Sequence, residues 1–246
     1  MAEKKETPVH VVKGRASPSY IIDGKGLAVV DVCFPSDAAR ILEYAEQEMG
    51  RESRDIKLIV LTHSHLDHVN GVDSLKAATG AELAAYINAR KYLAGKKAIK
   101  CAPWDRLTEF AGFMIRNGLP RPSLKDVFSM RWSGIPGIKR GIRSGLDHRL
   151  KDGENLPGHA GWSVVYTPGH TDDSICLYNA GHRMLISGDT LINIAGKLIL
   201  NPMLRLDERA MQESLEKLKQ LDIDTVYPGW GEPLHRKNIL KRIKAE

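Results

Sequence analysis

A buried strand that leads straight into a cluster of histidines is the strongest structural signal in this 246-residue chain. Residues 56–61 are apolar at five of six positions. Such a run predicts a strand inside a protein core rather than on its surface. Three histidines and one aspartate then fall within the six residues from His63 to His68. A rigid strand that ends in such a cluster fixes the positions of its side chains, as a metal site requires.

The spacing within this cluster predicts two neighbouring ligand positions. Side chains two apart on an extended backbone point to the same side, so His63 and His65 can hold one cation together. Asp67 and His68 follow where the chain turns, and they can reach a second position beside the first. Imidazole nitrogen and carboxylate oxygen suit zinc, with iron or manganese as alternatives. The cluster is therefore interpreted as a metal site for one or two ions.

Two later turns supply further candidate ligands. His170 follows a strand predicted at 163–166, and Asp189 follows a strand predicted at 183–186. Neighbouring glycines let the backbone approach a site closely at both places. Either turn alone would be ordinary, since Gly-Asp and Pro-Gly are common turn pairs. Their combination with the histidine cluster makes them candidates.

The rest of the chain predicts two sheets packed face to face with helices outside. Short β-branched runs separated by tight turns over residues 9–32 predict antiparallel strands, and further strands are expected at 82–86, 175–178 and 225–227. Helices are expected after Ser36, which is placed as an N-cap, at 72–79, at 207–221 and as a basic C-terminal helix. No repeat or linker divides the sequence, so residues 1–246 are interpreted as a single domain.

The middle segment, residues 95–151, differs from its surroundings. It holds 13 Lys and Arg against 4 Asp and Glu, a net charge of +9. Apolar residues at helical spacing predict an amphipathic helix over 103–116, and glycines and prolines interrupt the part that follows. Such a segment inside a compact domain is typical of an active-site lid, and its charge favours anionic substrates. A surface insertion without a partner is the alternative.

Composition excludes several classes of protein. No apolar run approaches the roughly 20 residues of a membrane-spanning helix. The charged N-terminus lacks the apolar core of a secretion signal. Three widely spaced cysteines exclude a disulfide framework and predict a reducing cytoplasm. The motifs GxSxG and GxGxxG are absent, so serine hydrolase and nucleotide-binding functions gain no support.

In order and spacing, the motifs resemble those of the metallo-β-lactamase superfamily over nearly the whole chain. The resemblance is carried by the hairpins ending at Asp31, the HxHxDH motif at 63–68, the turn at His170, Gly188-Asp189 and Pro228-Gly229-Trp230-Gly231. It implies an α+β fold, a four-layer αββα sandwich with the metal site at one edge between the sheets. It also implies that the first metal is held by His63, His65 and His170, the second by Asp67 and His68, with Asp189 bridging the two.

One position departs from the pattern of that family. Many members with two metals carry a histidine ligand in a final Pro-Gly-His-Gly turn, where this sequence has Trp230. An indole nitrogen is a donor only and cannot bind a cation. A second metal would then bind more weakly with extra water ligands, or the protein would work with one metal. His235, placed on the C-terminal helix, is a less favoured substitute. Trp230 is also assigned to the substrate pocket, where its flat ring supplies apolar contact.

The favoured function is a metal-dependent hydrolase in which an activated water attacks a small, anionic ester, thioester, lactone or amide. Asp67 is assigned as the catalytic residue that orients the water or acts as general base. Two alternatives remain: a nuclease or phosphodiesterase of the RNA-processing branch, and a degenerate, non-catalytic member. A small molecule is the expected partner, and nucleic acid is the less favoured one. The sequence leaves the oligomeric state open, a homo-oligomer included.

Overall fold

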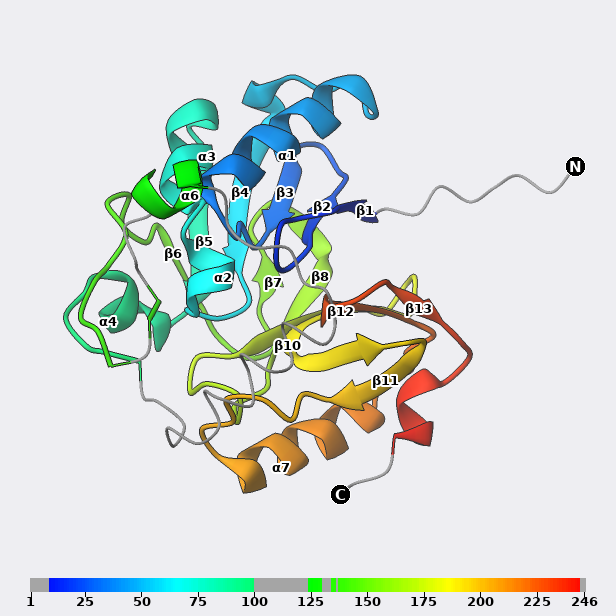
Figure 1. Cartoon of the computed structure of the whole chain (residues 1–246). Coiled ribbons are helices and arrows are strands. Elements are labelled where there is room, and N and C mark those ends of the chain that lie inside the picture. The colour runs from blue at the N-terminus through cyan, green and yellow to red at the C-terminus, as the bar shows by residue number, and fades with distance from the viewer. Residues whose placement is uncertain (1–8, 100–123, 130–133, 136, 244–246) are drawn as a thin grey trace, which may run out of the picture.

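Two mixed β-sheets form the centre of the molecule (Figure 1). The structure is a computed structural model, which describes residues 9–99, 124–129, 134–135 and 137–243. The first sheet has the strand order β1-β2-β3-β4-β5-β6, in which β1 to β3 are antiparallel and β3 to β6 parallel. Its strands are β1 Val9–Val12, β2 Ser19–Ile22, β3 Leu27–Val30, β4 Ile56–Leu61, β5 Glu82–Tyr86 and β6 His148–Leu150.

The second sheet has the order β13-β12-β10-β9-β8-β7, and β11 pairs with β10. β10 and β12 are parallel, and the other pairs are antiparallel. Its strands are β7 Asn155–Leu156, β8 His159–Tyr166, β9 Ile175–Asn179, β10 Met184–Ile194, β11 Lys197–Leu200, β12 Thr225–Trp230 and β13 Leu234–His235.

Alternating side chains of each sheet divide between two apolar layers. One face of the first sheet packs on α1, Pro35–Gln47, and α3, Val72–Thr79, while its other face packs on the second sheet. Neighbouring residues show this division, since Val29 belongs to the layer under the helices and Val30 to the layer between the sheets. The outer face of the second sheet packs on α7, Glu208–Lys219. In Figure 1 the helices α1 and α3 accordingly lie on the opposite side of the molecule from α7. The predicted αββα sandwich is confirmed.

Several predicted elements are confirmed residue by residue. The hairpins of β1 to β3, the buried strand β4 and the helix α3 lie where the sequence places them. Gly80 ends α3 in the left-handed conformation, with φ of 70°. Asp207 caps α7, because its side chain accepts a hydrogen bond from the N–H of Ala210 (3.0 Å).

The predicted start of α1 and the predicted C-terminal helix are wrong. Ser36 lies inside α1, which begins at Pro35, and Asp37 rather than Ser36 accepts a hydrogen bond from the N–H of Phe34 (3.1 Å). In the last described segment, β13 pairs with β12 and a 3₁₀ turn follows at Ile239–Arg242. Asn238 precedes that turn with φ of 50°, a left-handed conformation that interrupts a helix.

Only parts of the predicted insertion fall within the described residues. The helix expected over 103–116 lies outside them. α6, Leu124–Ser129, and β6 lie inside, and β6 is a full member of the first sheet. The shorter helices are α2, Leu66–Val69, and α4, Ala89–Leu93, with a 3₁₀ turn at Ser53–Asp55. Among the described helices, none combines the length and the apolar character needed to cross a bilayer.

Candidate metal centre

Segments far apart in the sequence meet where strands of the two sheets end. β4 of the first sheet leads into the segment that carries His63 and His65, and His170 lies in the turn between β8 and β9 of the second sheet. The N–H of Ile175 in β9 donates a hydrogen bond to the carbonyl oxygen of Thr62 (2.9 Å). This bond joins the sheets at the edge where both histidine-bearing segments emerge.

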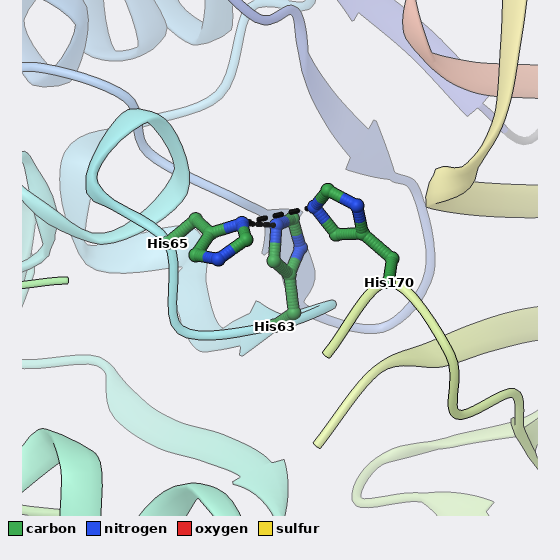
Figure 2. Close-up of side chains that lie close together, drawn as sticks. All are labelled: His63, His65 and His170. Carbon is green, nitrogen blue, oxygen red and sulfur yellow. Dashed lines mark hydrogen bonds between the residues drawn. The ribbon is translucent and has the colours of Figure 1, made fainter. Parts of the chain in front are cut away.

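Three imidazoles converge at this edge (Figure 2). Nε2 of His63 lies 3.2 Å from Nδ1 of His65, and that same Nδ1 lies 2.9 Å from Nε2 of His170. The rings stand edge to face, with centroids 4.7 to 4.9 Å apart. All three side chains are buried. The nitrogens surround one point, as the ligands of a single cation do.

The charge state of these rings suits a metal ligand. Burial lowers the pKa of His63 and His65 well below the ordinary value, and the neighbouring histidines lower both further. Burial also lowers the pKa of His170, although Asp189 opposes the shift. A neutral imidazole offers one nitrogen lone pair, which is the form that binds a metal cation.

Hydrogen bonds on the far side of the rings fix which nitrogen keeps its proton. The hydroxyl of Thr62 donates to Oδ2 of Asp31 (2.7 Å), so its oxygen accepts from Nδ1 of His63 (3.1 Å). Nδ1 of His170 likewise donates to the carbonyl oxygen of Met203 (3.2 Å). Protons held on Nδ1 leave Nε2 of both rings with a lone pair, as is usual for histidine ligands.

A second group adjoins the first and shares His63 with it. Its members are His63, His68 and Asp189. Nδ1 of His68 donates to Oδ2 of Asp31 (2.8 Å), so its Nε2 faces the group. That Nε2 and Oδ1 of Asp189 lie 3.3 Å apart, and neither has a hydrogen-bond partner among the described residues. Two buried polar atoms in this condition indicate a missing ligand, because leaving them unpaired is costly.

Asp67 lies beside this second group. Its Oδ2 is 3.5 Å from Nε2 of His68, and neither ligand group includes it. Burial raises the pKa of Asp67 to about 6, although His68 opposes the shift. Burial would lower the pKa of His68, but Asp67, Asp31 and Asp189 raise it well above the ordinary value. Burial opposes ionisation of Asp189, but the charge of His68 outweighs it and lowers that pKa to about 2.

Asp189 lies inside β10 rather than after a strand, so the predicted strand end at 186 is wrong. Gly188 has φ of 46°, and the pairing of β10 with β12 shifts register there. The glycine therefore allows a bulge that turns the Asp189 carboxylate toward the histidines without ending the strand.

Gly229→Ala is expected to displace Asp189. A Cβ at this position would collide with Oδ1 of Asp189 and lie 2.7 Å from the backbone carbon of Gly188. We expect a loss of about 1–3 kcal/mol in the free energy of unfolding, together with weaker metal binding. Thermal unfolding and metal titration measure both. Gly181→Ala is the matched control, because its Cβ would meet only Asn179 Oδ1 at an ordinary 3.5 Å. Equal behaviour of the two variants would contradict the prediction.

Comparison with known proteins decides the family. The model of the metallo-beta-lactamase superfamily matches residues 12–230, which include every member of both ligand groups. The chain belongs to this superfamily. The predicted family is thereby confirmed, and so is the prediction of an enzyme, a metallo-hydrolase.

The chain is similar to several curated proteins and solved structures at low sequence identity. The probable metallo-hydrolase YqjP of Bacillus subtilis (strain 168) is 28% identical over 222 residues, which cover 87% of this chain and 67% of that protein. A hydroxyacylglutathione hydrolase of Hydrogenovibrio crunogenus is 27% identical over 210 residues, and the match spans 84% of this chain and 54% of the relative. Among solved structures, a metallo-beta-lactamase family protein of Thermus thermophilus has a TM-score of 0.61 at 20% identity, covering 96% of this chain and 76% of that one. This last likeness concerns the fold.

Trp230 is the residue at which the resemblance to the superfamily implies a further histidine ligand. Its side chain is 3% exposed and packs against Ile192 and Met203. Its indole N–H donates to Oδ2 of Asp189 (3.2 Å). The ring thus reaches the ligand cluster from a buried position and contacts it through a proton rather than a lone pair.

His235 takes no part in either ligand group. It lies on β13 instead of the predicted helix, is exposed, and its Nδ1 is 2.8 Å from the hydroxyl oxygen of Thr225. The idea that it replaces the missing ligand is wrong, because pairing with β12 holds it in the sheet.

Sequence reasoning missed the residues that support the ligands. Asp31 accepts hydrogen bonds from Thr62 and His68, and Asp173 is buried and accepts one from the hydroxyl of Ser64. Burial raises the pKa of Asp173 to about 6. The sequence analysis named Asp31 only as the end of the hairpins that carry the resemblance and gave it no role, and the partners of both carboxylates come from distant segments.

Proposed function

We propose that this chain is a zinc-dependent hydrolase of a small ester, thioester, lactone or amide. The observation that carries the proposal is the convergence of three neutral, buried imidazoles beside a carboxylate whose pKa lies near 6. The relatives named as metallo-hydrolases and as hydroxyacylglutathione hydrolase support it, and the latter substrate is a thioester.

His63, His65 and His170 would hold the cation through Nε2, Nδ1 and Nε2, respectively. Three nitrogen ligands with room for one more ligand are the usual arrangement of catalytic zinc. A divalent cation held there would supply Lewis-acid chemistry and would lower the pKa of a bound water to about 7. Met203 and Thr62 keep the rings oriented, so the lone pairs need no reorganisation.

Asp67 would act as general base. Its carboxylate oxygen would accept the proton of the attacking water beside Nε2 of His68, 3.5 Å away, and would pass it to the leaving group when the scissile bond breaks. A carboxylate with a pKa near 6 is ionised at neutral pH and still basic enough to take up a proton. Asp189 would orient the water from the other side through Oδ1, its oxygen without a described hydrogen-bond partner.

The segment 95–151 would cover the site and favour an anionic substrate. Its described part touches the ligand-bearing loop, because the N–H of Leu66 donates to the carbonyl oxygen of Gly134 (3.1 Å). Asp126 of α6 also accepts a hydrogen bond from the N–H of Ser36 (3.2 Å), which ties the segment to α1. Basic side chains on a cover of this kind raise the local concentration of anions.

A substrate panel with zinc-loaded protein tests the proposal. We expect turnover of at least one class among aryl esters, acyl thioesters, lactones and amides, with a carboxylate-bearing member preferred over its neutral analogue. A β-lactam and a bis-aryl phosphodiester complete the panel. Turnover of the phosphodiester alone would replace the proposal by the nuclease function. No turnover of any member by metal-loaded protein would overturn it in favour of a non-catalytic protein.

The pH profile tests the role of Asp67. We expect kcat/KM to fall as the pH drops through about 6 or below, because protonation removes the base and a bound cation pulls its pKa downward. Asp67→Asn should lower kcat by about 10²–10⁴-fold and remove this acid limb. An unchanged acid limb in the variant would show that another group titrates there.

A further inference from the structure

The two ligand groups cannot both be filled, because they share His63. Nδ1 of His63 carries a proton, since the Thr62 hydroxyl oxygen that faces it has already given its own proton to Asp31. Only Nε2 of His63 retains a lone pair, and one imidazole lone pair binds one cation. That Nε2 already faces His65 in the first group (3.2 Å).

Without His63, the second group retains two ligand atoms. These are Nε2 of His68 and Oδ1 of Asp189, 3.3 Å apart. The Asp67 carboxylate lies 3.5 Å from Nε2 of His68 and belongs to neither group. The first group, by contrast, keeps three imidazole nitrogens within ligand distance of one another. Zinc sites in proteins usually have at least three protein ligands, so the two positions differ strongly in binding strength.

Trp230 closes the remaining side of the second position. Its N–H donates to Oδ2 of Asp189 (3.2 Å), and the amide nitrogen of Asn201 lies 3.4 Å from the same oxygen. Gly229 packs against Oδ1 from the backbone side. The indole is 3% exposed, so it cannot swing aside for another ligand. It presents a positive dipole end where a cation would need a lone pair.

We propose that the chain binds a single cation tightly, in the group of His63, His65 and His170, and that Trp230 keeps the position at His68 and Asp189 a weak site. The inference rests on the metal site of the proposed function. Removing a hydrogen bond to a ligand already costs about 10–100-fold in metal affinity, so the absence of a direct ligand should cost at least about 100-fold.

Zinc binding by the full chain, measured in zinc–chelator buffers by elemental analysis, tests the proposal. Wild-type protein should take up one equivalent at low free zinc and a second only at concentrations at least about 100-fold higher. Trp230→His adds a lone pair and should bind a second equivalent near the first. Trp230→Phe removes the N–H without adding a ligand, so it should retain one. If the wild-type protein bound two equivalents of zinc with affinities within about tenfold of each other, the inference would be overturned.

A second variant, at His68, tests the inference independently in case Trp230→His fails to fold. His68→Ala should still bind one zinc ion tightly. If the wild-type protein instead bound two zinc ions tightly, this variant would lose one of them. Circular dichroism confirms folding of each variant. One tight zinc without hydrolysis would defeat the proposed function and leave this inference standing. No tight zinc at all would overturn both.

Discussion

Replacing His63 with alanine is expected to abolish tight metal binding and to lower hydrolysis by about 10³-fold or more. Its Nε2 is common to both ligand groups, so no alternative set of three survives among the described residues. Without a cation, water keeps its pKa of about 15.7 and Asp67 alone cannot generate a nucleophile at neutral pH. Elemental analysis and substrate turnover give the two readouts.

Thermal unfolding separates lost chemistry from lost folding in this variant. A cation that binds only folded protein stabilises it, so a chelator should lower the Tm of the wild type and leave that of His63→Ala unchanged. His182→Ala is the control, because this histidine is exposed and belongs to neither group. It should behave as wild type in all three assays. Full turnover by metal-free His63→Ala would refute the metal-dependent mechanism.

Local pattern was sufficient to predict most of the fold. Apolar runs identified β3 and β4, and helical spacing with a terminal glycine identified α3. These elements follow local rules, since alternation and capping depend on residues a few positions apart. The start of α1 failed because Asp37, inside the helix, is held by the backbone of both Phe34 and the distant Arg15.

The candidate site likewise has features that the local sequence predicts and features that it does not. The ligand types at 63–68 can be predicted from sequence because they lie within six consecutive residues. The placement of Asp189 depends on a bulge at Gly188, and the contact of Trp230 with that carboxylate spans 41 positions. Neither feature has a local signature. The sequence could therefore show that Trp230 is no ligand, but not that it is buried and donates a hydrogen bond to Asp189.

Asp31 illustrates why supporting residues are hard to find from sequence and how much depends on them. Its carboxylate accepts three buried hydrogen bonds, from the N–H and the hydroxyl of Thr62 (2.8 and 2.7 Å) and from Nδ1 of His68 (2.8 Å). Through Thr62 it also determines the proton position on His63. One side chain thus orients a ring in each ligand group.

Asp31→Asn is expected to weaken metal binding and kcat/KM by about 10–100-fold. Asparagine tolerates the φ of 58° at this position, so the backbone is preserved. Its amide, however, places a donor where the carboxylate met only donors. That donor faces either the N–H of Thr62 or both the Thr62 hydroxyl and Nδ1 of His68. In the latter case the Nδ1 proton of His68 loses its acceptor, so the ring must turn away from its present orientation toward Asp189. Imidazole ¹⁵N chemical shifts report that proton directly.

Asp31→Ala should cost more in stability than the asparagine variant. It leaves three buried donors unsatisfied, at about 1–3 kcal/mol each, and alanine is strained at positive φ. Asp23→Asn is the matched control, since Asp23 also follows a strand but is exposed and pairs with Arg51. A purely structural role for Asp31 would lower Tm while leaving the metal affinity and the His68 imidazole ¹⁵N chemical shifts of the folded asparagine variant unchanged. That outcome would remove Asp31 from the metal centre, because orientation of the ligand rings predicts that all three quantities change together.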